Sequence, residues 1–155
     1  MESYNENYGK QLQKLLHAVT KSQKRYIEAS EKIDVAELKN LFNRYAFDRN
    51  QIISELNQAI LNFGVQISDS NDEIISHHWN EDGNSPDSKK DQSIMEKLRS
   101  TERETLDAYD DVLQGTILEN FNLKTLIMGH RLIINEAFTE LDRRYFELFK
   151  LSQPY

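Results

Sequence analysis

Apolar residues recur at helical spacing along most of this chain. At 100° per residue, two successive sets fall on single faces and predict amphipathic helices over residues 10–33 and 35–63. Residues 1–9 are polar, so we expect them to lie outside the first helix. The two stripes are Leu12, Leu15, Val19, Tyr26, Ala29 and Ile33 in the first helix, and Leu38, Leu41, Phe42, Tyr45, Ile52, Leu56, Ala59 and Phe63 in the second.

Two further helices are predicted over residues 90–115 and 119–151. Gly64 and Gly115 stand where helices commonly end, and Glu37 stands where a capping box would open the second helix. The stripes are Leu98, Thr105, Tyr109, Val112 and Thr116 in the third helix, and Leu123, Ile127, Ile134, Phe138, Leu141, Tyr145 and Leu148 in the fourth.

Residues 64–89 are polar and rich in turn formers, with one apolar island at Ile74, Ile75 and Trp79. We interpret them as a long connection that holds one short helical piece and is long enough to cross a bundle from end to end. The sequence therefore predicts one all-α domain over residues 1–155, a ferritin-like four-helix bundle with a crossover between helices two and three. A simple up-down-up-down bundle is the alternative, since length alone does not fix the direction of helix three.

Polar residues interrupt all four stripes at similar heights. Arg49 lies near the middle of the second helix and Glu102 near the middle of the third, while Gln23 and His130 stand at matching depth in the first and fourth. A buried carboxylate needs a partner. We therefore predict that Arg49 pairs with Glu102, and that His130, Gln23 and a tyrosine such as Tyr109 complete the hydrogen bonds.

A metal centre is the competing interpretation of this layer, because ferritin-like bundles hold metals at this depth. Such centres use Glu-x-x-His pairs, and the chain contains none. Arg49 places a cation where a metal site needs an anion. We predict no metal and no cofactor, with Glu102 and His130 as the ligands if one binds.

The composition narrows the function classes. A formal net charge of −7 argues against nucleic acid as a partner, and the short basic run at residues 21–25 is interpreted as a solvated helix face. The absence of cysteine fits a cytoplasmic protein, and no apolar run is long enough for membrane insertion.

No phosphate loop or nucleophile motif supports an enzyme. His77 and His78 are interpreted as a surface pair beside Trp79 rather than as a metal site.

Several apolar residues lie off the stripes and should face outward. Phe47, Ile27, Ile133 and Phe146 are in this group. Apolar residues on the outer faces of long helices indicate a partner surface. They lead to the hypothesis of a homodimer, or of a complex with another protein.

Four segments carry a family resemblance: RYIEASEKIDVAELKNLF, DRNQIISELNQAILNFG, HHW and STERETLDAYDDVL. In this order and spacing the chain resembles a ferritin-like bacterial family, domain of unknown function 2383. Glu102 and Tyr109 match the family's Glu and Tyr on the third helix, and Trp79 matches the Trp of its crossover. Family members often carry a histidine late in the fourth helix, where this chain has Phe138.

The resemblance implies a ferritin-like bundle with a crossover, and a loose association with stress. Taken with the patterns above, it favours a non-enzymatic helical-bundle protein that acts through protein association. The alternative function is metal or small-ligand binding centred on Glu102 and His130.

Overall fold

The computed structural model describes residues 4–64 and 87–150. These residues form four long helices, α1 (Tyr4–Lys32), α2 (Ala36–Asn62), α3 (Asp87–Val112) and α4 (Phe121–Tyr145). A 3₁₀ turn, η3 (Thr116–Glu119), precedes α4, and a π-helical turn, η4 (Phe146–Lys150), follows it. The described ranges contain no strand. The predicted all-α four-helix bundle is confirmed.

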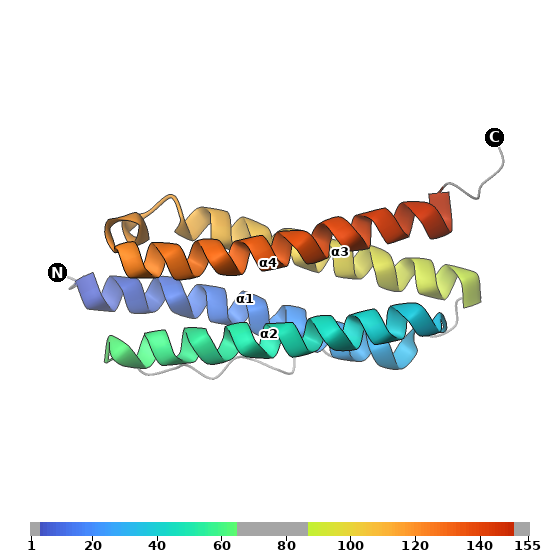
Figure 1. Cartoon of the computed structure of the whole chain (residues 1–155), viewed down its shortest axis with the longest axis horizontal. Helices are drawn as coiled ribbons and strands as arrows, with labels where there is room; N and C mark the ends of the chain where they lie inside the picture. The colour runs from blue at the N-terminus through green and yellow to red at the C-terminus, as the bar shows by residue number, and fades with distance from the viewer. Residues whose placement is uncertain (1–3, 65–86, 151–155) are drawn as a thin grey trace.

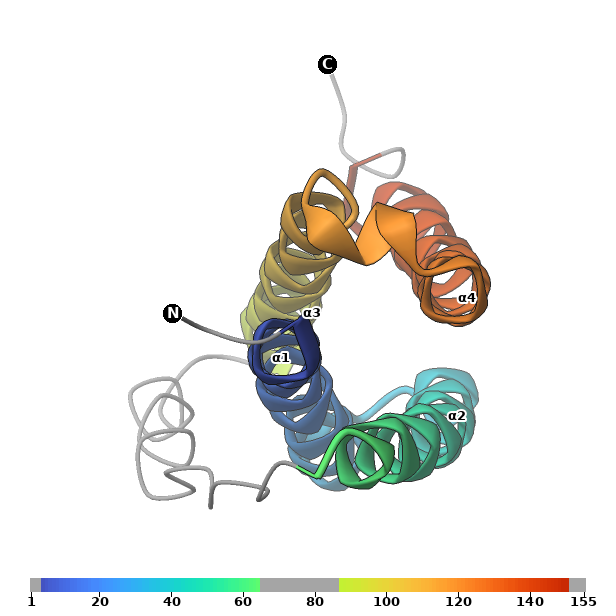
Figure 2. The same cartoon turned by 90° about the vertical axis from the view of Figure 1, so that its left-hand side faces the viewer.

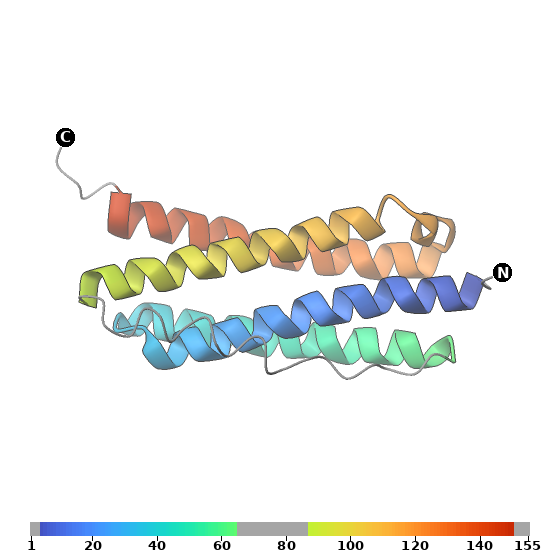
Figure 3. The ribbon, with the colours of Figure 1, turned by 180° about the vertical axis from the view of Figure 1, so that it is seen from behind.

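The directions of the helices settle how they are connected. α1 and α4 run one way along the bundle, and α2 and α3 run the other way (Figures 1 and 3). The end of α2 and the start of α3 therefore lie at opposite ends of the bundle (Figure 1). The alternative up-down-up-down order is wrong. The predicted helical piece at Ile74, Ile75 and Trp79, with His77 and His78, lies outside the described residues.

Seen end-on, the four helices form an incomplete ring (Figure 2). α1 packs against α2 on one side and α3 on the other, and α3 packs against α4. The ring is least closed between α4 and α2, whereas α2 and α3 face each other diagonally across the centre (Figure 2). None of the helices in the described ranges has the length and apolar content needed to cross a bilayer.

The core consists of two apolar clusters, one toward each end of the bundle. The first gathers Tyr8, Leu12, Leu15, Val19, Ile52, Leu56, Ala59, Ile60, Leu106, Tyr109, Val112, Ile117, Leu123, Ile127 and Ile134. The second gathers Tyr26, Ala29, Ile33, Leu38, Leu41, Phe42, Tyr45, Ala46, Ile94, Met95, Leu98, Ala137, Leu141 and Tyr145. The predicted stripes supply most of both clusters, because burying one face of each helix is the main source of their stability.

The first helix is longer than the pattern predicts, because α1 begins at Tyr4 rather than near residue 10. Tyr8 is buried, and its ring centroid lies 5.5 Å from that of Phe63 at the end of α2. Residues this far apart in the sequence give no local sign of the contact. Gly64 follows at φ 71°, a left-handed conformation that glycine adopts at little cost, as expected for a helix end.

The third and fourth helices end earlier than predicted. α3 ends at Val112, three residues before Gly115, and Thr116 belongs to η3, where its hydroxyl donates to Asn7 Oδ1 at 2.6 Å. In α4 the buried face passes through Ala137 instead of Phe138. Phe138 is half-buried, and the guanidinium carbon of Arg103 lies 4.5 Å from its ring centroid. Leu148, also predicted to be buried, is exposed.

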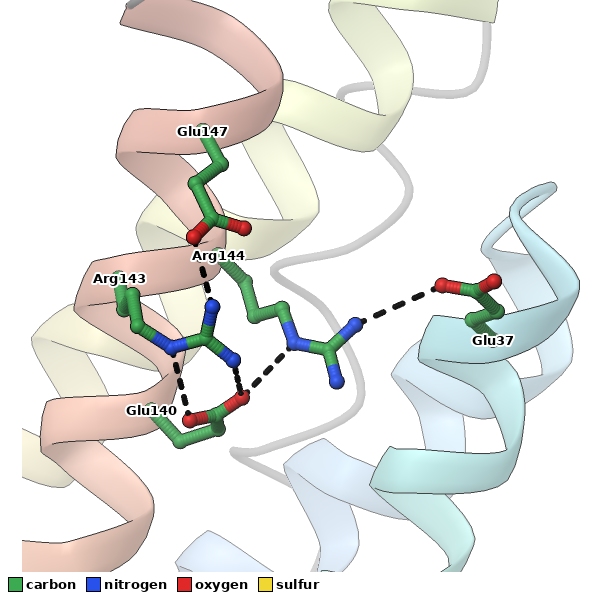
Figure 4. A network of polar contacts seen from close by, with 5 residues as sticks. All are labelled: Glu37, Glu140, Arg143, Arg144 and Glu147. Atoms are coloured by element: carbon green, nitrogen blue, oxygen red, sulfur yellow. Dashed lines mark hydrogen bonds and ion pairs between the residues drawn. The ribbon is translucent and has the colours of Figure 1, made fainter.

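One ion pair bridges an end of the gap between α2 and α4 (Figure 4). Arg144 of α4 lies 3.6 Å from Glu37 of α2 and donates to Glu140 at 2.8 Å. Glu37 does not form the predicted capping box, since the N-cap of α2 is Val35, which makes no side-chain cap. The same carboxylate links two helices instead.

Candidate functional site

A buried ion pair crosses the centre of the bundle. Arg49 of α2 and Glu102 of α3 are both 0% exposed. The Nη2 atom of the Arg49 guanidinium contacts Oε2 of the Glu102 carboxylate. Because α2 and α3 are diagonal, the pair joins two helices that are not neighbours around the ring (Figure 2). The predicted pairing of Arg49 with Glu102 is confirmed.

Ser22 of α1 completes the pair. Its hydroxyl donates to Glu102 Oε1 at 2.7 Å and accepts from Arg49 Nε at 3.3 Å. Gln23, predicted for this place, does not reach Glu102. Its amide lies between α1 and α2 and donates to Asn50 Oδ1 at 3.3 Å and to the Ala46 carbonyl at 3.5 Å. One residue along a helix turns the side chain by 100°, which is enough to move it out of the core.

Tyr26 stacks on the same guanidinium, with Arg49 Cζ 5.5 Å from the ring centroid. Burial alone would lower the pKa of Arg49, but the charge of Glu102 and the nearby Tyr26 raise it by more, so the arginine stays charged. Burial, and then the negative charge of Glu102, raise the pKa of Tyr26 well above its ordinary value. The centre of the bundle therefore holds one full ion pair and a neutral tyrosine.

A second polar group leads from the core toward the surface. Tyr109 Oη lies 3.3 Å from His130 Nδ1, and His130 Nε2 lies 3.6 Å from Glu55 Oε1. His130 is buried, whereas the Glu55 side chain is 42% exposed. Burial lowers the pKa of His130, and the Glu55 carboxylate opposes this only in part. Burial also raises the pKa of Tyr109, so both of these core groups are neutral near pH 7.

Protein groups already contact most of the atoms that a metal would need. Both oxygens of Glu102 accept hydrogen bonds from protein groups, and His130 Nδ1 lies within hydrogen-bond distance of Tyr109, whereas His130 Nε2 is 3.6 Å from Glu55, beyond that distance. In the described part of the chain, His, Asp and Glu side chains form no group of three or more that could hold a metal ion. The hydrogen bonds of Glu102 join α1, α2 and α3 at one height and so contribute to fixing the register of these helices.

The histidine should make the fold less stable in mild acid. Its folded pKa lies below the usual 6.5, so the unfolded chain binds more protons as the pH falls below about 6.5. Stability is therefore fully present above that pH and is lost as the pH falls through the folded pKa. We expect the free energy of unfolding to decline over this range in the natural chain, and less so in His130→Gln. Urea titrations at a series of pH values measure this slope.

The exposed His17 supplies the control for that experiment. His17→Gln should keep the pH dependence of the natural chain, because its side chain lies outside the core. The interpretation would be wrong if His17→Gln flattened the profile and His130→Gln did not.

Two members of the layer were not anticipated in their roles. Ser22 lies next to the predicted Gln23, and its part in holding Glu102 depends on the rotation of α1. Glu55 lies about 80° around α2 from the centre of the apolar stripe, so the sequence pattern predicts a surface carboxylate. Its contact with His130 of α4 depends on the distance between the two helices.

One comparison with known proteins identifies a family. The family described as a domain of unknown function, DUF2383, matches residues 7–115. This range covers α1 from its fourth residue onward and all of α2 and α3, and with them the whole Ser22–Arg49–Glu102 group. Searches among curated proteins and among solved structures gave no match. Since the match spans most of the chain, this protein belongs to the domain of unknown function 2383 family.

Proposed function

We propose that this protein acts by protein association, without catalysing a reaction, and that its partner is a second copy of the same chain bound through the outer face of α4. The observation that carries the proposal is an apolar stripe on that face. Phe121, Met128 and Leu132 are 76%, 52% and 60% exposed. They follow one another at seven and four residues, so they lie on one side of the helix.

The stripe lies directly opposite the buried face of α4. That buried face passes through Leu123, Ile127, His130, Ile134, Ala137, Leu141 and Tyr145. Leu118 of η3, also exposed, precedes the stripe along the chain. A helix that is apolar on both sides is typical of one covered on both sides. Exposed apolar residues in such a row mark a protein contact surface more often than isolated ones do.

Charge favours a second copy as the occupant. The chain carries a net charge of −7, yet residues 120–135 contain no Asp or Glu. Two copies can therefore meet here with little repulsion between like acidic surfaces. An apolar stripe is also complementary to itself, as a two-fold symmetric interface requires. The space beside Gly129, within the same stretch of α4, is open, so another backbone can come close there.

Other outward apolar residues do not form such a row. Phe47, Ile27, Ile133 and Phe146 are exposed, as the sequence predicts, but they stand on α2, α1, α4 and η4. Their role as a partner surface stays a prediction. The predicted link to stress, the bacterial character of the family and the cytoplasmic location likewise rest on the resemblance and the composition. The alternative of metal or small-ligand binding centred on Glu102 and His130 also stays a prediction.

Sedimentation velocity over a range of protein concentrations tests the proposal. We expect a reversible dimer for the natural chain. Leu132→Glu should shift the equilibrium to monomer, by at least about tenfold in dissociation constant, because it places two carboxylates in an apolar interface. Circular dichroism should show the same helix content, since Leu132 does not face the core.

Phe47→Glu is the matched control, because Phe47 is 73% exposed on α2, away from the stripe. This variant should dimerise like the natural chain. A natural chain that stays monomeric at high concentration would overturn the proposal, as would an equal loss of dimer in both variants.

A further inference from the structure

We propose that a cavity between α1 and α3 binds a small oxyanion of the phosphate class. The cavity measures about 220 Å³ and is lined by Lys21, Arg25, Lys97, Ser100, Thr101 and Glu104. Three cationic side chains thus surround one hollow on a protein whose net charge is −7. The short basic run of α1, which the sequence alone presents as a solvated face, supplies two of them.

The register of the two helices explains why these residues meet. α1 and α3 run antiparallel and side by side (Figure 3). Ser22 bonds to Glu102, and Lys21 bonds to Glu104. In antiparallel helices, three residues further along α1 correspond to about three residues back along α3, so Arg25 comes level with Ser100 and Thr101. Lys97 follows one turn beyond, and Ser100 and Glu104, which also line the cavity, are exposed.

Burial makes Arg25 the anchor of this site. Arg25 is 6% exposed, and it lies at the wall of a cavity several times larger than the volume of one water, which is about 30 Å³. A guanidinium held in low dielectric attracts an anion more strongly than one in water, and its planar fork fits two oxygens of a phosphate. Lys21 and Lys97 add point charges from the opposite helices, a geometry that suits a tetrahedral dianion with several acceptor oxygens.

The Glu104 carboxylate competes with the ligand at Lys21. Glu104 Oε2 accepts from Lys21 Nζ at 3.0 Å, and the Glu104 side chain is 60% exposed. This exposed ion pair is weak, so an entering dianion can replace it at Lys21. Removing the carboxylate should therefore strengthen the binding of phosphate at this site. Nonspecific attraction of phosphate to the protein surface would depend much less on this one residue.

Isothermal titration of the full chain with inorganic phosphate, at constant ionic strength, tests the site. We expect saturable binding of one ion per chain. Glu104→Gln should bind roughly threefold to tenfold more tightly, and Lys97→Gln should bind more weakly by a similar factor, as expected for adding or losing one partly screened charge interaction. Arg25→Gln should abolish the binding, and circular dichroism will show whether this buried change also affects the fold.

Lys39→Gln is the control, because Lys39 is an exposed lysine on α2 outside the cavity. It should leave the affinity unchanged. Glycerol phosphate, titrated in parallel, distinguishes a site for phosphate esters, which binds both probes, from a site for the free ion, which binds inorganic phosphate alone. The proposal is overturned if phosphate gives no saturable binding, if Glu104→Gln fails to strengthen it, or if Lys39→Gln weakens it as much as Lys97→Gln.

Discussion

Replacing Glu102 by alanine is expected to lower the free energy of unfolding by about 3–5 kcal/mol, because it leaves the guanidinium of Arg49 buried without its counter-ion. Arg49 is 0% exposed, so water cannot reach it without opening the bundle. The Ser22 hydroxyl would lose its acceptor as well. Urea denaturation followed by circular dichroism measures the change.

Two further variants make this result interpretable. Glu104→Ala removes a carboxylate two residues away that pairs with Lys21 at the surface, and it should cost less than about 1 kcal/mol. The double change Arg49→Met with Glu102→Leu removes both charges and fills similar space, so it should recover most of the stability. If Glu102→Ala were as mild as Glu104→Ala, the pair would not be buried in solution.

The stability lost in the single variant is thus not the net value of the ion pair. Bringing both charges out of water costs several kcal/mol, which their attraction and the bond from Ser22 offset. What the pair adds is specificity, because a charged group on α2 can be satisfied only where α3 offers its partner. This requirement fixes the register between α2 and α3, which lie diagonally opposite each other. A link across the centre suits a bundle whose ring is least closed between α2 and α4.

The core pair could be predicted because charged residues stood out within otherwise apolar stripes. Arg49 and Glu102 interrupt apolar stripes that are long enough to define the buried face of each helix. Because the two residues carry opposite charges at the same height, an ion pair between them could be predicted. Ser22 and Gln23 differ by only 100° around α1, so choosing between them requires the actual rotation of the helix. The early start of α1 depends on the contact of Tyr8 with Phe63, which no local pattern contains.

The outer surface was harder to predict for a different reason. In the first half of α4, apolar residues surround the helix, so the pattern does not separate the core side from the outer side. The stripe of Phe121, Met128 and Leu132 emerges only when the inner face is fixed by packing. The cavity at Arg25 depends in the same way on the register between α1 and α3, since the residues that line it are far apart in the sequence.

Phe42→Ala should cost about 3–5 kcal/mol and should destabilise both ends of the bundle equally. Phe42 is 0% exposed in the second apolar cluster, with its ring centroid 6.1 Å from that of Tyr26. The polar layer separates this cluster from the first. All four helices nevertheless run through the layer, and the Arg49–Glu102 pair can form only when both α2 and α3 are folded. We therefore expect one cooperative unit.

Amide hydrogen exchange at the two ends measures this directly, because global unfolding limits the slowest amides of each cluster. In Phe42→Ala the slowest amides around Leu15 and Leu56, in the first cluster, should lose as much protection as those around Leu41. Leu56→Ala, expected to cost about 2–5 kcal/mol, is the reciprocal variant. If each substitution lowered protection only in its own cluster, the polar layer would divide the bundle into two units that unfold separately.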